Sequence, residues 1–77
     1  MKHWILEVGN TRAKWACFDA QAEPSASPVE VHSAAASDAR TASTWRDSVG
    51  PEDKVMVTGS GDLDPWASAF PEAMVLR

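Results

Sequence analysis

Cysteine, long apolar runs and basic residues are all scarce in this chain of 77 residues. A single cysteine, Cys17, can neither close an internal disulfide nor form a zinc site by itself, so the usual staples of a small domain are missing. The apolar run Trp4-Ile5-Leu6 ends at Glu7, too early for a secretory signal or a membrane span. Seven basic residues against eleven acidic ones give a net charge of −4, which argues against non-specific nucleic-acid binding. We therefore expect a cytoplasmic chain that binds neither membrane nor nucleic acid and is stabilised by packing or by a partner.

The composition that remains is that of an ordinary globular chain, with 44% hydrophobic and 23% charged residues. A chain of this length buries only about 60% of its unfolded surface, so one small core is the limit. The charge is unevenly distributed: residues 1–18 hold three basic residues against one acidic, and residues 19–77 hold four against ten. Such a basic patch can bind a small anion, although it can equally be a solvated edge.

The first eighteen residues have the pattern of two strands joined by a tight turn. Residues 4–8 and 12–18 are rich in aromatic and branched side chains, and Gly9-Asn10-Thr11 separates them. Alternation places Trp4, Leu6 and Val8 on one face of the first strand, but neither face of the pair is cleanly polar. The mixed pattern predicts strands covered on both sides, as in the middle of an α/β sheet.

The rest of the chain predicts three more strands and two helices. A loop over residues 20–28 precedes an edge strand at 29–33, and Ser37 or Asp38 can cap a helix that stops at Gly50-Pro51. An apolar strand at 55–57 and a short helix with Asp64 as its N-cap follow. A last strand at 73–76 completes the order β-β-β-α-β-α-β, a mixed sheet whose parallel strands need helices on both faces. The helix stripe is Ala39, Ala42, Trp45 and Val49, and the four tryptophans are expected in the core.

We expect residues 1–77 to be a single partial domain, the front portion of a longer one, because the last strand has no helix after it. A partner chain that completes the sheet is the competing explanation.

One segment combines residue types that can bind phosphate and its metal. Glycine at the turn lets backbone N–H groups approach an anion, and Asn10, Thr11 and Lys14 add donors and a positive charge. Glu7 can hold Mg²⁺, which prefers carboxylates together with phosphate oxygens. The alternative is that Gly9-Asn10 is a hairpin turn with positive φ and no function. The candidate site residues are Glu7, Val8, Gly9, Asn10, Thr11, Arg12, Ala13 and Lys14.

Residues 6–16, Leu-Glu-Val-Gly-Asn-Thr-Arg-Ala-Lys-Trp-Ala, resemble the N-terminal phosphate motif of type III pantothenate kinases. That motif is Asp-x-Gly-Asn-Thr/Ser with Lys three positions on, and it is matched here by Gly9, Asn10, Thr11 and Lys14. The family belongs to the actin-like, sugar-kinase superfamily, whose ribonuclease-H-like core begins β-β-β-α-β-α. The resemblance thus implies a truncated mixed-sheet half-domain of that fold.

The resemblance also implies a function for the whole protein: transfer of the ATP γ-phosphoryl group to pantothenate, the first step toward coenzyme A. It implies that residues 7–14 bind ATP phosphates, that Glu7 serves the metal and the catalytic step, and that the cofactors are ATP, Mg²⁺ and K⁺ or NH₄⁺. A homodimer is implied as well. Glu7 replaces the family's Asp, and the later Gly-Ala-Asp-Arg segment that carries the catalytic base has no counterpart, so we expect this chain alone to be inactive.

Two other functions stay open. The chain can be a non-catalytic binding or regulatory module that pairs with a partner chain, or a hairpin-containing domain without a ligand. Thr58-Gly59-Ser60-Gly61 is interpreted as a turn at the carboxyl edge of the sheet, because it lacks the Lys and the spacing of a P-loop. Cys17 is interpreted as a buried, inert thiol.

Overall fold

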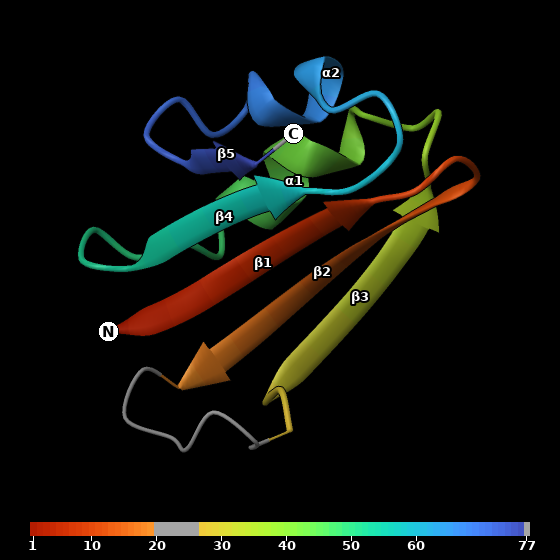
Figure 1. The fold of residues 1–77 in the computed structure, drawn as a ribbon. Coiled ribbons are helices and arrows are strands. Elements are labelled where there is room, and N and C mark those ends of the chain that lie inside the picture. The colour runs from red at the N-terminus through yellow and green to blue at the C-terminus, as the bar shows by residue number, and fades with distance from the viewer. Residues whose placement is uncertain (20–26, 77) are drawn as a thin grey trace.

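The computed structural model describes residues 1–19 and 27–76, and its elements follow the predicted order (Figure 1). The described elements are β1 (Lys2–Val8), β2 (Arg12–Asp19), β3 (Glu30–Ala35), α1 (Thr41–Arg46), β4 (Lys54–Thr58), α2 (Asp64–Ala67) and β5 (Met74–Leu76). The chain is therefore an α/β protein. Most of the loop expected over residues 20–28 lies outside the described residues. In the described part, no helix has the length and apolar character needed to cross a membrane.

The strands form one mixed sheet in the order β3-β2-β1-β4-β5. β2 pairs antiparallel with both β1 and β3, whereas β4 pairs parallel with both β1 and β5. A tight turn suffices for the β1–β2 pair, and the parallel strands are reached through the segments that contain α1 and α2. β3 lies at an edge, as its one-sided alternation predicted. The carboxyl ends of β1, β4 and β5 meet at one edge of the sheet, where ligands bind in many open α/β sheets.

The core lies on one face of the sheet. Register places Trp4 beside Cys17, Leu6 beside Trp15 and Val8 beside Ala13, and all six side chains are buried. Both helices cover this face. The remaining buried residues are Ala42, Trp45, Val57, Leu63, Trp66 and Phe70.

The four tryptophans lie in this core, as predicted, and their rings stack. Trp15 lies 4.7 Å from Trp4 and 6.0 Å from Trp45 between ring centroids, and Trp45 lies 5.4 Å from Trp66. Phe70 stacks on Trp15 at 5.1 Å. The indole N–H of Trp66 donates to the Ala36 carbonyl at 3.0 Å. The aromatic rings thus join the sheet to both helices in one continuous cluster.

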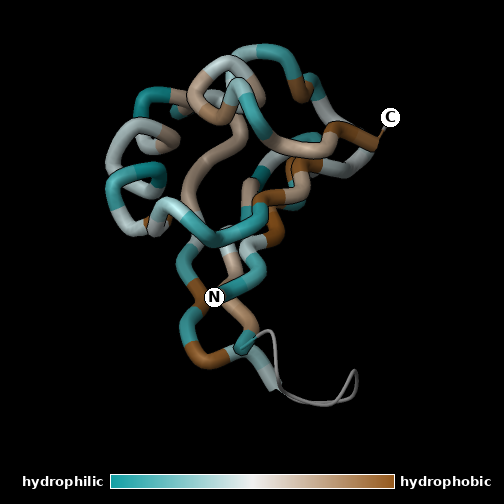
Figure 2. The backbone as a smooth tube through the Cα atoms, turned by 90° about the vertical axis from the view of Figure 1, so that its left-hand side faces the viewer, coloured by the Kyte–Doolittle hydropathy of each residue, from teal (hydrophilic) through white to brown (hydrophobic). Residues whose placement is uncertain are grey.

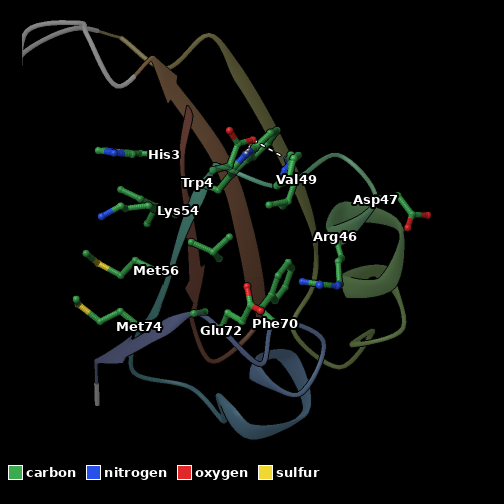
Figure 3. A pocket seen from close by; sticks show the side chains of 16 residues that line it. His3, Trp4, Arg46, Asp47, Val49, Lys54, Met56, Phe70, Glu72 and Met74 are labelled. Carbon is green, nitrogen blue, oxygen red and sulfur yellow. Dashed lines mark hydrogen bonds between the residues drawn. The ribbon is translucent and has the colours of Figure 1, made fainter. Parts of the chain in front are cut away.

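The opposite face of the sheet is open, so the expectation of helices on both faces is wrong for the described residues. Figure 3 shows Met56 and Met74 pointing away from the side on which Phe70 and α1 lie. Val31, Met74 and Leu76 are 53%, 61% and 47% exposed. In Figure 2 the backbone beside the C-terminal label is brown, the colour of hydrophobic residues. The mixed apolar and polar pattern of β1 and β2 therefore reflects one buried face and one amphiphilic, uncovered face.

Local boundaries differ from the prediction at both helices and at the first turn. α1 begins at Thr41 rather than after Ser37 or Asp38, and the Asp38 carboxylate instead accepts a hydrogen bond from the Thr41 hydroxyl at 3.1 Å. The N-cap of α2 is Leu63, which moves Asp64 into the first turn. Gly9 does not have positive φ, so the left-handed hairpin turn is also wrong.

The Asp53 carboxylate links the start of β1 to the segment before β4. Asp53 accepts hydrogen bonds from the Lys2 amide at 2.8 Å, the Trp4 indole at 3.0 Å and the Gly50 amide at 2.8 Å. The bond from Trp4, followed by those from Gly50 and Lys2, lowers the pKa of Asp53 to about 2. Asp53 thereby ties the start of β1 to the turn that precedes β4.

Candidate functional site

Two loops meet at the carboxyl edge of the sheet. The turn of residues 9–11 follows β1, and the loop of residues 59–62 follows the neighbouring parallel strand β4. The Gly61 amide donates to the Val8 carbonyl at 2.9 Å. Gly59 has a φ of 134°, and a side chain there would clash with the Val8 backbone; one at Gly61 would clash with the Gly9 carbonyl. The two glycines allow a backbone-to-backbone contact that fixes the turn, which the sequence-based interpretation of residues 58–61 did not foresee.

Glu7 and Lys14 lie side by side on the open face, next to this turn. Register pairs Glu7 with Lys14 on β2 and with Thr58 on β4, so the three side chains share one face. Glu7 and Lys14 are both exposed. No ion pair joins them within the described residues, so each charge is free to meet a ligand. The structure thus brings together the carboxylate and the ammonium group that the sequence singled out.

Arg12 belongs to the same face. It stands two residues before Lys14 on β2, and its Nη2 donates to the hydroxyl of Ser33 on β3 at 3.0 Å. Ser33 is itself the register partner of Lys14. Two positive side chains, Arg12 and Lys14, therefore lie next to each other, with a single carboxylate, that of Glu7, in the adjoining position. This arrangement favours an anion.

The turn residues divide into core and exposed groups. The side chains of Val8 and Ala13 are 1% and 0% exposed, so these two residues can contribute only main-chain atoms to a site. The Gly9 amide already donates to the Arg12 carbonyl at 2.8 Å. Asn10 and Thr11 are exposed, and the Thr11 carbonyl accepts the Ala36 amide at 2.9 Å, which anchors the turn to the segment after β3. Within the turn of residues 9–11, the side-chain donors that a ligand can reach are therefore those of Asn10 and Thr11.

A small cavity of about 340 Å³ opens on the helix side of the same turn. Its polar lining comes from Asn10, Ser37 and Asp62, and the rest is glycine and apolar surface from Val8, Gly9, Ala36, Ala39, Gly61 and Pro65. It contains no basic residue, so its chemistry suits hydroxyl or amide groups better than phosphate. Asn10 lines this cavity, whereas Arg12 and Lys14 do not.

A larger cavity of about 880 Å³ lies at the opposite end of the sheet (Figure 3). It curves around the outer edge of β4, between Phe70 and Val49 on one side and Met56 and Met74 on the other. None of residues 7–14 lines it. It is therefore separate from the candidate site.

A magnesium ion that is shared with phosphate could use one carboxylate at this turn, that of Glu7. Within the described ranges, no three side chains of His, Cys, Asp or Glu cluster to bind a metal. Mg²⁺ needs no such cluster, because it commonly binds one or two carboxylates together with substrate phosphates and waters. Glu7, exposed beside Lys14 and Thr58, is the residue that would hold it.

Cys17 and the histidines take no part in this arrangement. The Cys17 side chain is buried, and burial raises the pKa of its thiol, as expected of an inert core cysteine. His32 lies 3.2 Å from Glu30 on the edge strand β3, and His3 is exposed near the start of β1.

Sequence reasoning did not place Ser33, Ser37 or Asp62 at the site, and it interpreted Thr58 only as part of a turn at the carboxyl edge of the sheet. Thr58 and Ser33 join the site only through strand pairing between distant segments, with Glu7 and Lys14 respectively. One signal was present: alternation along β3 and β4 places both residues on the open face once the register is known. Register itself is a tertiary property, so the two segments could not be aligned from the sequence pattern alone.

Comparison of the chain with protein-family models, with curated proteins and with solved structures finds no match.

Proposed function

We propose that residues 7–14 are the nucleotide-phosphate site of the N-terminal part of an ATP-dependent kinase that phosphorylates pantothenate. The observation that carries this proposal is the placement of Glu7 and Lys14 as register partners beside the Gly9–Thr11 turn, at the carboxyl end of β1. Pantothenate is proposed as the substrate because residues 6–16 resemble the phosphate motif of type III pantothenate kinases. In this proposal the five-stranded mixed sheet is the ribonuclease-H-like half-domain of that superfamily.

Phosphoryl transfer is catalysed mainly by positioning and by neutralising charge, and the open face offers both. Lys14 binds phosphate oxygens, and the exposed donors of Asn10 and Thr11 orient the chain of phosphates. Mg²⁺, held by Glu7, would offset the negative charge of the phosphates. The acceptor oxygen forms its bond to the γ-phosphorus as the bond to the bridging oxygen of ADP breaks, and the hydroxyl proton passes to a base outside this chain.

Calorimetry of Mg·ATP binding to the 77-residue chain at low salt tests the proposal. Lys14→Ala is expected to weaken binding by about tenfold or more, because charge-assisted contacts of this kind contribute about 1.5–3 kcal/mol. Lys54→Ala is the matched control: Lys54 is exposed and pairs with His3 at the far end of the sheet. The Lys54→Ala variant should bind Mg·ATP with the same affinity as the unaltered chain. A folded chain that binds no Mg·ATP, or one that is equally sensitive to both substitutions, would contradict the proposal.

A non-catalytic module is the second candidate, and the open face favours it. Val31, Met74 and Leu76 are exposed on β3 and β5, which lie at the two edges of the sheet. An uncovered apolar face on a sheet with parallel strands is the surface that a partner would cover. In that case the chain would self-associate or co-purify with a partner, and Lys14→Ala would leave its binding behaviour unchanged.

A further inference from the structure

We infer that Ser33 on β3 is a positioning residue that holds Arg12 as a second phosphate-binding cation beside Lys14. The inference rests on the proposed function, because it concerns the same phosphate site. It adds a residue from a distant strand, and it names the ligand chemistry that the pair selects: a polyphosphate, whose neighbouring phosphates can meet two cations at once.

The geometry begins with β2. Arg12 and Lys14 are two residues apart on this strand, so their side chains lie on one face with Cα atoms about 7 Å apart. Both are exposed, and the described residues provide no carboxylate partner for the Arg12 guanidinium. Its polar contact is neutral: Nη2 donates to the Ser33 hydroxyl at 3.0 Å.

A neutral anchor leaves the charge of Arg12 available. A carboxylate in the place of Ser33 would pair with the guanidinium and compete with an incoming phosphate. A hydroxyl accepts one hydrogen bond and leaves the other N–H donors of the guanidinium unused. Arginine loses considerable side-chain entropy when it is ordered, so an anchor made before the ligand arrives reduces the entropic cost of binding.

The position of Ser33 makes this anchor specific. Ser33 is the register partner of Lys14, and Arg12 reaches it across the diagonal of the β2–β3 pair. The hydrogen bond therefore draws the guanidinium toward Lys14 instead of letting it extend into solvent past the turn. The Glu7 carboxylate on the other side of Lys14 completes a row in which two cations and one metal-binding carboxylate face the same side.

The test is calorimetric titration of the 77-residue chain with two probes, Mg·ATP and inorganic tripolyphosphate. Arg12→Ala is expected to weaken binding of both by about tenfold or more, and Ser33→Ala by about fivefold. Ser33→Thr, which keeps the hydroxyl, should restore the affinity. In the Arg12→Ala background, Ser33→Ala should have no further effect, because the hydroxyl then has no guanidinium to position. Ser43→Ala, an exposed serine on α1, is the matched control and should bind like the unaltered chain.

The outcomes separate this inference from the proposed function. Binding of Mg·ATP that depends on Lys14 but not on Arg12 or Ser33 would overturn the inference and leave the kinase proposal intact. Binding of tripolyphosphate that depends on Ser33, with no binding of Mg·ATP, would uphold the cation pair and contradict the nucleotide site. A folded chain that binds neither probe would overturn both. A Ser33→Ala variant that weakens binding but is not rescued by threonine would also overturn the positioning role.

Discussion

Replacing Asp53 with asparagine is expected to destabilise the chain in a pH-dependent way. One oxygen of Asp53 accepts the Lys2 amide, and the other accepts both the Trp4 indole and the Gly50 amide. An asparagine can place its carbonyl where two donors converge, but its NH₂ group then faces the Lys2 amide, donor against donor. Asp53→Asn therefore removes the negative charge and at least one of three hydrogen bonds.

The pKa of Asp53 sets the size of the expected loss of stability. Its value falls from 3.8 to about 2, a difference that corresponds to about 2.4 kcal/mol for a fully shielded group. Asp53 is only partly buried, and solvent screening reduces its contribution to about 1 kcal/mol. A domain of this length has a stability of about 4–12 kcal/mol, and each kcal/mol changes Tm by about 4–8 °C. We expect Asp53→Asn to lower Tm by about 4–8 °C at pH 7.

The sign of the pH dependence follows from the lowered pKa. The stabilisation is complete above about pH 5, where the carboxylate is ionised in both the folded and unfolded states, and it is lost as the pH falls through about 2. Thermal melts followed by near-ultraviolet circular dichroism of the stacked tryptophans, at pH 7, 4, 3 and 2, measure the difference in Tm between the unaltered chain and the Asp53→Asn variant. Glu52→Gln is the control for the loss of one exposed charge next to Asp53. A difference in Tm that stays constant from pH 7 to pH 2 would refute the role given to the carboxylate charge.

Two further predictions concern the core and the loop contact. The indole nitrogen of Trp15 is buried without a hydrogen-bond partner in the described residues, whereas that of Trp66 donates to the Ala36 carbonyl. Trp66→Phe should therefore cost about 1–3 kcal/mol more than Trp15→Phe in urea denaturation, since an unpaired buried donor carries a penalty of that size; equal costs would contradict this reasoning. Gly61→Ala should destabilise the chain by about 1–3 kcal/mol and weaken Mg·ATP binding, because its methyl group would displace the Gly9 carbonyl. Ser60→Ala in the same loop should change neither quantity, and a Gly61→Ala variant that binds Mg·ATP normally would show that the loop contact does not shape the turn.

The parts of the fold that could be predicted are those that depend on local pattern. Alternation identified β1 and β2 and separated Trp4, Leu6 and Val8 from Glu7, and the helical period identified Ala42 and Trp45 as core. The helix starts could not be predicted as well. Ser37 and Asp38 have the right side chains for a cap, but hydrogen bonds of the turn, including that from the Ala36 amide to the Thr11 carbonyl, hold the chain in another path until Thr41.

Which face of the sheet the helices cover could not be predicted from the sequence, because it depends on where each helix crosses the sheet. Ile5, Ala16 and Phe18 are only partly exposed although no helix within the described residues covers them. A strand with apolar residues on both faces thus has the same pattern whether its second face is covered or merely crowded. The sequence alone could not distinguish these two cases.

The candidate site shows the same division between local and tertiary information. Its motif is continuous, and Glu7, Gly9, Asn10, Thr11 and Lys14 were all identified from eight consecutive positions. The contacts that hold these residues in place are discontinuous in the sequence: the Gly61 amide bonds the Val8 carbonyl, and the Ser33 hydroxyl accepts a hydrogen bond from Arg12. Without these contacts the same eight residues would be an exposed hairpin whose cations point in many directions. In the proposed phosphate site, the affinity should therefore depend on residues far from the motif as well as on the donors within it.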